Sequence, residues 1–384
     1  MTQQHAPIAP SSLALTVACN ASVQLQANAP PLPNGDEEAL EGEAAHQLAM
    51  WVALGHNTFN LGDKFTVNGK EWVIDNEMLN GARLYAKVIQ ENSRGNARLE
   101  DPVRCSRIHP TQSWGTPDAW EYFPEGLDWS QGLPVLSTKD YKYGHRFVEV
   151  FECFQLIAYA VGEMERLDLI DDTRLMLEFV IVQPRSYHRE GPVRRWRIRA
   201  DELRALVNIA RNAAERALLP NPTATTGTHC LDCKARHVCG TLRETAANVV
   251  DYSTQGMLEP LDPIALGNEL RILNAAAKRL EARQTGLAAM VDAMLRAGQR
   301  VPHFELAPGR SNMVWNPDVT PEQVGTLGDL FNVLTRKPLA VITPRQAIDA
   351  GIDESIVKEY ASRPPAGLVV KPVSTTNATK VFSK

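Results

Sequence analysis

The sequence feature that most constrains the fold is Asp140-Tyr141-Lys142, which follows the apolar run Leu133–Leu136. Strand residues two apart point to the same face of a sheet, so the carboxylate and the amine are expected side by side where this strand ends. Asp118 lies 22 residues upstream (140 − 118). The pattern predicts two neighbouring strands that present acidic side chains at one place, although Asp-x-Lys alone is also typical of a surface ion pair.

Two such aspartates are hard oxygen ligands, which Mg²⁺ and Mn²⁺ prefer. Together with the backbone carbonyl of Tyr141, Asp118 and Asp140 could hold one of these ions and leave some of its waters in place. Lys142 would then orient or deprotonate an attacking water and offset charge on a phosphate. The residues therefore predict metal-dependent hydrolysis of a phosphodiester.

Two flanking patterns add candidates to this site. His46 lies on the inner side of a helix expected over Glu38–Leu54, and Gln155 and Tyr159 share one face of a helix expected over Val148–Leu167. Each also has an ordinary interpretation, because a lone histidine is often a core residue and an i,i+4 pair is common on amphipathic helices.

The order of these motifs resembles that of the RecB-type branch of the PD-(D/E)xK nucleases. The resemblance rests on His46, Gly115-Thr116-Pro117-Asp118, Asp140-Tyr141-Lys142 and Gln155-Leu156-Ile157-Ala158-Tyr159. It implies an α/β (α+β) fold with a restriction-endonuclease-like core, in which helices flank a mixed central sheet. It also implies that His46, Asp118, Asp140 and the Tyr141 carbonyl bind Mg²⁺ or Mn²⁺, that Lys142 is catalytic, and that Gln155 and Tyr159 steady the active site or the DNA backbone.

A second pattern is the cysteine cluster Cys230-x2-Cys233-x5-Cys239. Three thiols within ten residues are suited to one metal centre. If His229 or His237 were the fourth ligand, the site would be tetrahedral zinc. If distant Cys19 were the fourth ligand, the site would suit a [4Fe–4S] cluster. The other two cysteines, Cys105 and Cys153, are expected to be small buried hydrophobic residues.

One N-terminal cysteine and a C-x2-C-x5-C cluster on either side of the nuclease motifs are similar to the iron–sulfur staple of AddB-type and CRISPR-adaptation-type RecB-like nucleases. That resemblance favours a [4Fe–4S] cluster on Cys19, Cys230, Cys233 and Cys239 over Zn²⁺. Together with Ile181–Arg185, these motifs also resemble a phage- and prophage-encoded RecB-like family over about residues 10–345. Its members are regarded as exonucleases that feed single strands to a phage recombinase or a single-strand annealing protein.

Four regions are expected along the chain. They are a flexible segment at 1–36, a nuclease domain at 37–245, a mainly helical region at 246–363 whose long helix covers the sheet, and a disordered tail at 364–384. Within them, alternation and turn residues predict a hairpin over Lys64–Ile74 and further helices and strands. The strands are Ala97–Arg104, Thr111–Tyr122, Leu133–Lys142, Leu175–Gln183, Val193–Arg199 and a pair within Arg300–Trp315; the helices are Asp75–Glu91, Ala200–Leu219, Pro263–Ala297 and short ones within 318–362.

Charge is unevenly distributed over a chain whose net charge is −5. Arginines crowd around Trp196, and a basic strip of this kind is expected to contact DNA phosphates, although it also suits a solvated strand. The arginines singled out are Arg185, Arg194, Arg195 and Arg197. With no apolar segment of about 20 residues and no basic start before an apolar core, the chain is expected to be cytoplasmic, with reduced thiols and no membrane partner.

The sequence therefore predicts a metal-dependent DNA exonuclease that acts on single- or double-stranded ends in phage recombination or replication. No Gly-x-x-x-x-Gly-Lys-Ser/Thr motif occurs, so unwinding would require a partner. Two alternatives belong to other classes. One is a catalytically silent module that binds DNA ends, and the other is a zinc-stabilised interaction protein.

Overall fold

The computed structural model describes residues 6–30, 36–56, 58–93, 95–186, 188–253, 263–302 and 304. The chain divides into two compact units, Met1–Leu306 and Ala307–Lys384. The fold described below is that of the first unit. The helices expected within 318–362, the tail at 364–384 and nearly all of the strand pair expected over Arg300–Trp315 lie outside the described residues.

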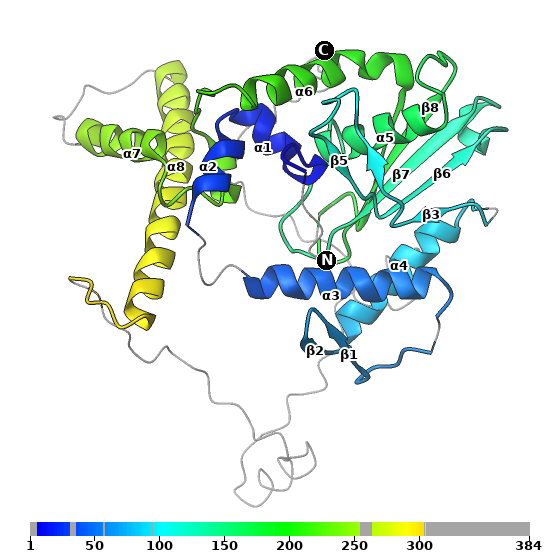
Figure 1. Cartoon of the computed structure of the whole chain (residues 1–384), viewed down its shortest axis with the longest axis horizontal. Coiled ribbons are helices and arrows are strands. Elements are labelled where there is room, and N and C mark those ends of the chain that lie inside the picture. Colours follow the sequence, from blue (N-terminus) through cyan, green and yellow to red (C-terminus); the bar gives the residue numbers. More distant parts are fainter. Residues whose placement is uncertain are drawn as a thin grey trace, which may run out of the picture. The chain divides into compact units, whose positions relative to one another are not determined.

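A five-stranded mixed sheet forms the centre of the unit, in the order β3-β6-β7-β8-β9. The strands β7 and β8 are parallel and are joined by a helix, α5, whereas the other neighbours are antiparallel. The predicted mixed sheet flanked by helices is therefore confirmed (Figure 1). The bounds are Arg98–Leu99 for β3, Ala119–Phe123 for β6, Val135–Tyr141 for β7, Phe154–Arg166 for α5, Met176–Val182 for β8 and Val193–Arg199 for β9.

Helices cover both faces of the sheet (Figure 1). On one face lie α3 (Asp36–Ala53) and α4 (Asn76–Gln90), where the Asp75 side chain caps α4 by accepting from the Met78 N–H at 2.8 Å. On the other face α5 packs beside α6 (Arg204–Ala217), which follows the 3₁₀ turn η3 (Ala200–Leu203). Each face has its own apolar core, one with Leu48, Tyr85, Tyr141 and Val182 and the other with Leu136, Ile157 and Phe179.

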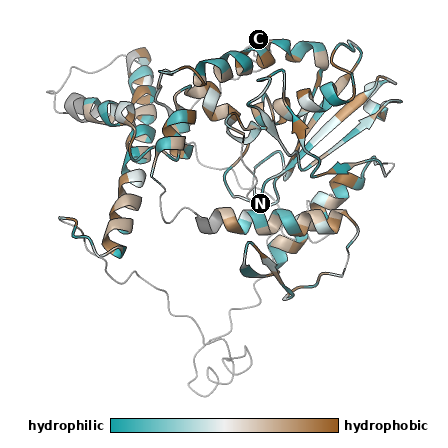
Figure 2. Cartoon of the chain, viewed as in Figure 1, coloured by the Kyte–Doolittle hydropathy of each residue, from teal (hydrophilic) through white to brown (hydrophobic). Residues whose placement is uncertain are grey.

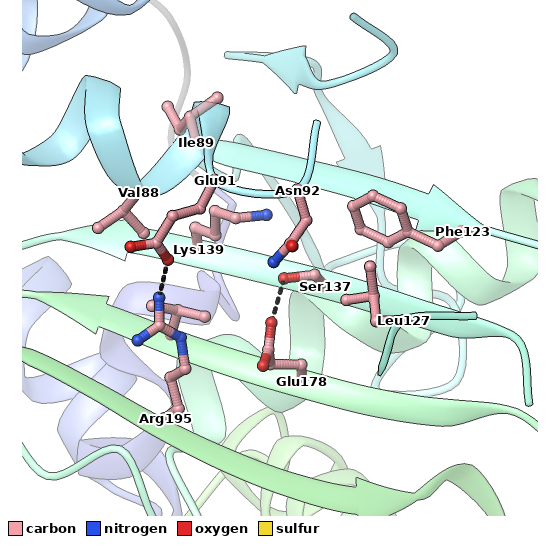
Figure 3. A pocket seen from close by; sticks show the side chains of 11 residues that line it. Val88, Ile89, Glu91, Asn92, Phe123, Leu127, Ser137, Lys139, Glu178 and Arg195 are labelled. Atoms are coloured by element: carbon pink, nitrogen blue, oxygen red, sulfur yellow. Dashed lines mark hydrogen bonds and ion pairs between the residues drawn. The ribbon is translucent and has the colours of Figure 1, made fainter. Parts of the chain in front are cut away.

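The central strand β7 is buried at all seven positions, yet its middle is polar. Thr138 faces α5 and donates to the Glu163 carboxylate at 2.5 Å, whereas Ser137, on the opposite face, donates to Glu178 at 3.2 Å. Figure 3 shows Ser137, Glu178 and Lys139 around a cavity of only about 10 Å³. The polar run is compatible with a central strand because its hydroxyls meet carboxylates, which satisfies groups that would be costly to bury alone.

Two predicted strands are wrong as continuous elements. The segment Ala97–Arg104 divides into β3 and β4 (Val103–Arg104), and Thr111–Tyr122 divides into β5 (Trp114–Gly115) and β6. The strands β4 and β5 form a separate two-stranded sheet. Left-handed backbone at Glu100 (φ 48°) breaks the first segment, and Pro117, which has no N–H, lies at the break in the second.

Other helix and hairpin predictions need smaller changes. The hairpin of β1 (Lys64–Val67) and β2 (Lys70–Val73) is confirmed. The helix α5 begins at Phe154 rather than Val148, because Glu152 has a positive φ of 54° and interrupts the helical backbone. The predicted helix at Ala200–Leu219 is present as η3 followed by α6.

The N-terminal segment is packed rather than flexible, which corrects the expectation for residues 6–30. Ile8 is fully buried, its N–H donates to the Gln112 carbonyl at 3.0 Å and its carbonyl accepts from the Ser113 hydroxyl at 2.9 Å. The segment forms η1 (Pro10–Ser12), α1 (Leu13–Ala18) and α2 (Ser22–Asn28). It adds a third apolar core beneath α5 and α6.

The C-terminal part of the unit consists of η4 (Thr228–Asp232), α7 (Gly240–Ser253) and the long helix α8 (Pro263–Arg296). The helices α7 and α8 belong to the same compact unit as the sheet, and the domain boundary expected at 245–246 lies within that unit. Among the residues that the structure describes, the long helix packs mainly on η4 and α7 rather than on the sheet. Within the described ranges, none of the helices is long and apolar enough to cross a membrane.

Burial raises the pKa of Glu163 to about 8, and the Thr138 hydrogen bond only partly opposes this effect. A carboxyl whose pKa is higher in the folded state loses stability as the pH rises from its ordinary value, about 4.5, to about 8. We expect Glu163→Gln, which cannot ionise, to gain stability relative to the wild type between pH 5 and pH 8. This gain in the free energy of unfolding is at most about 1.4 kcal/mol per pH unit. That limit applies when the folded chain binds one proton that the unfolded chain does not bind. Urea denaturation at both pH values measures this difference.

The same substitution at the exposed Glu125 should leave the pH dependence of unfolding unchanged. If the difference in the free energy of unfolding between Glu163→Gln and the wild type is the same at pH 5 and pH 8, the pKa of Glu163 is not raised.

Candidate active site

The carboxylate of Asp140 lies at the end of β7 and is enclosed by two partners. Lys142 Nζ is 3.0 Å from its Oδ2, and Gln155 Nε2 donates to its Oδ1 at 2.8 Å. Lys142 Nζ also donates to Gln155 Oε1 at 3.1 Å, which closes a triangle of three side chains. The predicted proximity of Asp140, Lys142 and Gln155 is therefore confirmed.

Asp118 lies immediately before β6, beside this triangle. Its Oδ2 accepts from the backbone N–H of Tyr141 at 2.6 Å and lies 3.6 Å from His46 Nδ1. The His46 ring meets the Tyr141 ring edge-on, with centroids 5.1 Å apart. The helix α3 thus brings His46 to the sheet from one face, whereas α5 brings Gln155 and Tyr159 from the other.

Tyr159 is nearly buried behind these carboxylates. Burial, followed by the charges of Asp118 and Asp140, raises the pKa of its phenol far above the ordinary value. The hydroxyl therefore stays protonated and remains a hydrogen-bond donor at any physiological pH. The structure thus brings together all six side chains that the sequence singled out for this site.

Glu100 was missed by the sequence analysis. Its carboxylate groups with His46 and Asp118, so that one ligand atom from each residue lies within 4.8 Å of the others. The backbone N–H of Glu100 donates to the Asp118 carbonyl at 3.2 Å, and its positive φ is the kind of strain that is concentrated at functional sites. In the sequence, the one signal for Glu100 is that an acidic residue lies two positions before Pro102, where a strand can break.

The donor set of His46, Glu100 and Asp118 fits a hard divalent cation, because it offers one imidazole nitrogen and two carboxylates. This changes the expected ligand set. Asp140 was predicted as a ligand, but it is outside the group within 4.8 Å and is bound by Lys142 and Gln155 instead. The Tyr141 carbonyl remains a prediction, since the contact of that residue with Asp118 is through its N–H.

Electrostatics couple the two halves of the site. Burial raises the pKa of Asp140, with Lys142 opposing and Asp118 adding to this effect. Burial disfavours the charge of Lys142, but the carboxylates of Asp140 and Asp118 more than offset this and raise its pKa. Although Glu100 is exposed as a residue, partial burial of its carboxylate and the charge of Asp118 raise its pKa to about 7. The carboxyl groups of the site therefore do not all ionise easily beside one another, which favours the binding of a cation there.

A second cluster forms where the N-terminal segment meets η4. Cys19 follows α1, and its Sγ accepts from the Thr225 N–H at 3.5 Å, while Cys230 Sγ accepts from the Gly227 N–H at 3.4 Å. Burial raises the pKa of Cys233 to about 11, and Cys19, Cys230 and Cys239 add to that effect through their charges. The four predicted cysteines therefore gather at one place, and none is in a disulfide.

The two local histidines differ. His229 forms hydrogen bonds with Cys19 and Cys230, which raise its pKa to about 10. Burial alone would raise the pKa of Cys19, but hydrogen bonds from His229 and Thr225 lower it below its ordinary value. His237 is buried, and neither of its ring nitrogens has a hydrogen-bond partner. The sulfur pair nearest His229 is thus prepared to be thiolate, which is the form that binds metal.

A family model described as "Protein of unknown function (DUF2800)" matches residues 5–344. The chain belongs to the DUF2800 family. The DUF2800 match begins before Cys19 and extends beyond α8, so it includes every residue of the candidate active site and all four clustered cysteines.

The arginines expected to form a basic strip around Trp196 of this DUF2800 protein have partners within the fold, and their contact with DNA stays a prediction. Arg194 is buried and donates to the Val148 carbonyl at 2.9 Å. The others, of which one follows β8 and two are alternate residues of β9, pair with carboxylates on α3, on α4, directly after α4 and on β8. These pairs are Arg185 with Glu41 and Glu77, Arg195 with Glu91 (Figure 3), and Arg197 with Glu178.

Removing the Glu100 carboxylate should weaken metal binding. We expect Glu100→Gln to reduce the affinity for Mn²⁺ by at least about 10-fold, as the loss of even an outer-sphere partner can do. The wild-type affinity should also fall as the pH is lowered through about 7, because a protonated carboxyl is a poor ligand. Isothermal titration calorimetry with Mn²⁺ at pH 6 and pH 8 measures both effects.

Glu125→Gln, at an exposed position away from the site, serves as the matched control and should bind Mn²⁺ like the wild type. Wild-type affinity in Glu100→Gln would show that Glu100 is not a ligand.

Proposed function

We propose that this protein is a Mg²⁺- or Mn²⁺-dependent deoxyribonuclease that hydrolyses phosphodiester bonds at DNA ends. The observation that carries the proposal is the convergence of Asp118, Asp140 and Lys142 at one end of the central sheet, with His46 and Gln155 reaching it from helices on opposite faces. This arrangement supports the interpretation of the core as a PD-(D/E)xK fold.

The divalent cation would bind at His46, Glu100 and Asp118, where it would neutralise charge on a phosphate and lower the pKa of a bound water. Lys142 is placed to help that water attack. Its ammonium lies against Asp140 and Gln155, so its direction is fixed before a substrate binds. A cation held in this way needs little reorganisation when negative charge develops on the phosphate.

A hollow beside the site suits a nucleotide. A cavity of about 510 Å³ lies at the hairpin of β4 and β5 and is lined by Arg104 and Trp114, which pair across the strands. The next residue, Gly115, is in close contact with the Tyr159 ring and Pro10; a Cβ there would lie 3.0 Å from Tyr159 Cε1. An exposed indole beside a guanidinium can stack a base and attract its phosphate, which supports a single-stranded end as the substrate.

The same proposal includes a [4Fe–4S] cluster on Cys19, Cys230, Cys233 and Cys239. A single zinc with Zn–S bonds of about 2.3 Å would require sulfurs about 3.8 Å apart. Among the described residues, the group of three or more ligand atoms within 4.8 Å of one another is the carboxylate–histidine set, not the cysteines. The wider spacing of the thiols supports a cluster over zinc.

The proposed setting follows from the sequence resemblance. The protein would act in the cytoplasm of a phage-infected or lysogenic cell and pass single strands to a recombinase or annealing protein. A catalytically silent role in binding DNA ends is the alternative, and the nuclease assay below separates the two.

Linear duplex and single-stranded DNA, labelled at the 5′ or the 3′ end, should be shortened in the presence of Mg²⁺ or Mn²⁺. Lys142→Met and Asp118→Asn should each reduce the rate by at least about 100-fold, because each removes a group that acts on the reacting phosphate or its metal. Gel analysis of the labelled products measures the rate and gives the direction of digestion.

Lys87→Met, an exposed lysine on α4, is the control for Lys142→Met and should leave cleavage unchanged. Circular dichroism establishes that each variant is folded. Full cleavage by folded Lys142→Met would refute the catalytic assignment, and binding without cleavage by the wild type would favour the silent role.

Protein purified without oxygen should be brown, with an absorbance band at about 400 nm and about four iron atoms per chain. Cys19→Ser should lose most of the band, because it removes one of the four proposed cluster ligands. Cys153→Ser changes a cysteine outside the cluster and should keep it. A colourless wild type that contains one zinc per chain would overturn the cluster assignment.

A further inference from the structure

The helix α8 has two different faces. One face is lined by small residues, and Ala276, Ala282 and Gly286 are buried where the helix packs on η4 and α7. The approach is close, since a Cβ on Gly286 would lie 3.0 Å from the backbone of His237. Arg283 reinforces this contact by donating to the His237 carbonyl at 2.5 Å. This face is already occupied within the unit.

The other face carries a leucine every seven residues. The positions are Leu266, Leu273, Leu280 and Leu287, and the series ends at Met294. Leu266 is 57% exposed, Leu273 is 43% exposed and Leu287 is 41% exposed, whereas Leu280 between them is half-buried. Figure 2 shows that apolar segments recur along the length of α8. A row of exposed leucines is costly in water, because burying each side chain contributes about 1.5–3 kcal/mol.

A second series lies between the leucines, with Leu270, Ala277, Gln284 and Val291 four residues after each of them. Together the two series form a heptad pattern over 29 residues (294 − 266 + 1), with leucine at each d position except the last. A straight helix drifts by about 20° per heptad from such a repeat. A strict seven-residue period over four heptads is therefore typical of a helix that winds around a second helix.

We propose that this stripe is the seam of a parallel two-stranded coiled coil, formed with α8 of a second copy of this chain. The partner must be a helix of about 42 Å, the distance from the first to the last of 29 helical residues at about 1.5 Å per residue. The longest proline-free stretch of sequence between 305 and 384 is 345–363, which has only 19 residues (363 − 345 + 1). A second copy supplies an identical apolar stripe of the required length.

The parallel direction follows from Gln284. In a parallel pair in register, Gln284 lies opposite Gln284 of the second copy, and the two amides can form hydrogen bonds. An antiparallel pair over the full stripe places each Gln284 against Leu273, which would leave the buried amide without a partner. The inference rests on α8 alone and does not depend on the proposed nuclease function.

The mass in solution tests the proposal. Light scattering after size exclusion, at about 10 µM full-length protein, should give twice the chain mass of 42.4 kDa. Leu273→Glu combined with Leu287→Glu should give the mass of a single chain, because two d layers would then bury like charges. Ile272→Glu makes the same chemical change at an exposed residue beside the stripe, and it should remain a dimer.

A single-chain mass for the wild type, or a dimer that survives the double substitution, would overturn the proposal. The direction is tested by Gln284→Cys under mild oxidation. A covalent dimer on a non-reducing gel supports the parallel pair, and its absence in a protein that is dimeric by mass would overturn the parallel register. Circular dichroism of each variant should show an unchanged total helix content.

Discussion

The candidate site depends on the burial of one charged group. The carboxylate of Asp140 is almost fully enclosed at the end of β7, and an enclosed carboxylate without partners is strongly disfavoured. Lys142 and Gln155 supply those partners, and both must then be held in place. The direction of α5, the crossover from β7 to the parallel strand β8, and the turn after Tyr141 all serve this requirement. The geometry of the candidate site is thus also what satisfies a buried carboxylate.

Much of this arrangement could be predicted because it is local. The strand period places Asp140 and Lys142 on one face, and the helix period places Gln155 and Tyr159 on another, so their side-chain directions follow from spacing alone. Glu100 could not be found in this way, since its contribution depends on a left-handed backbone at the break between β3 and β4. The carboxylate partners of Arg185, Arg195 and Arg197 could not be predicted for a related reason, because whether a surface charge is paired depends on acids that are distant in the sequence.

The polar middle of β7 illustrates the same limit. Ser137-Thr138-Lys139 departs from the apolar pattern of a central strand, and nothing in the local sequence explains it. In the fold, Glu163 and Glu178 come from two later elements and face these residues from opposite sides of the sheet. The polar residues of β7 and the four clustered cysteines thus acquire their partners from segments that are distant in the sequence, and local periodicity cannot predict such contacts.

The packed N-terminal segment has a consequence for how the chain reaches its fold. Ala21 N–H donates to the Thr223 carbonyl at 3.1 Å, Gln24 donates to the Ala217 carbonyl at 3.1 Å, and Cys19 accepts from Thr225. Residues that are synthesised early therefore form these contacts only after about two hundred further residues have been synthesised. At synthesis rates of about 5–20 residues per second, that interval is on the order of 10–40 seconds. During it, the buried surface of Ile8 and Leu13 has no native partner on α6, so the last steps of folding of this unit can only follow the emergence of η4 from the ribosome.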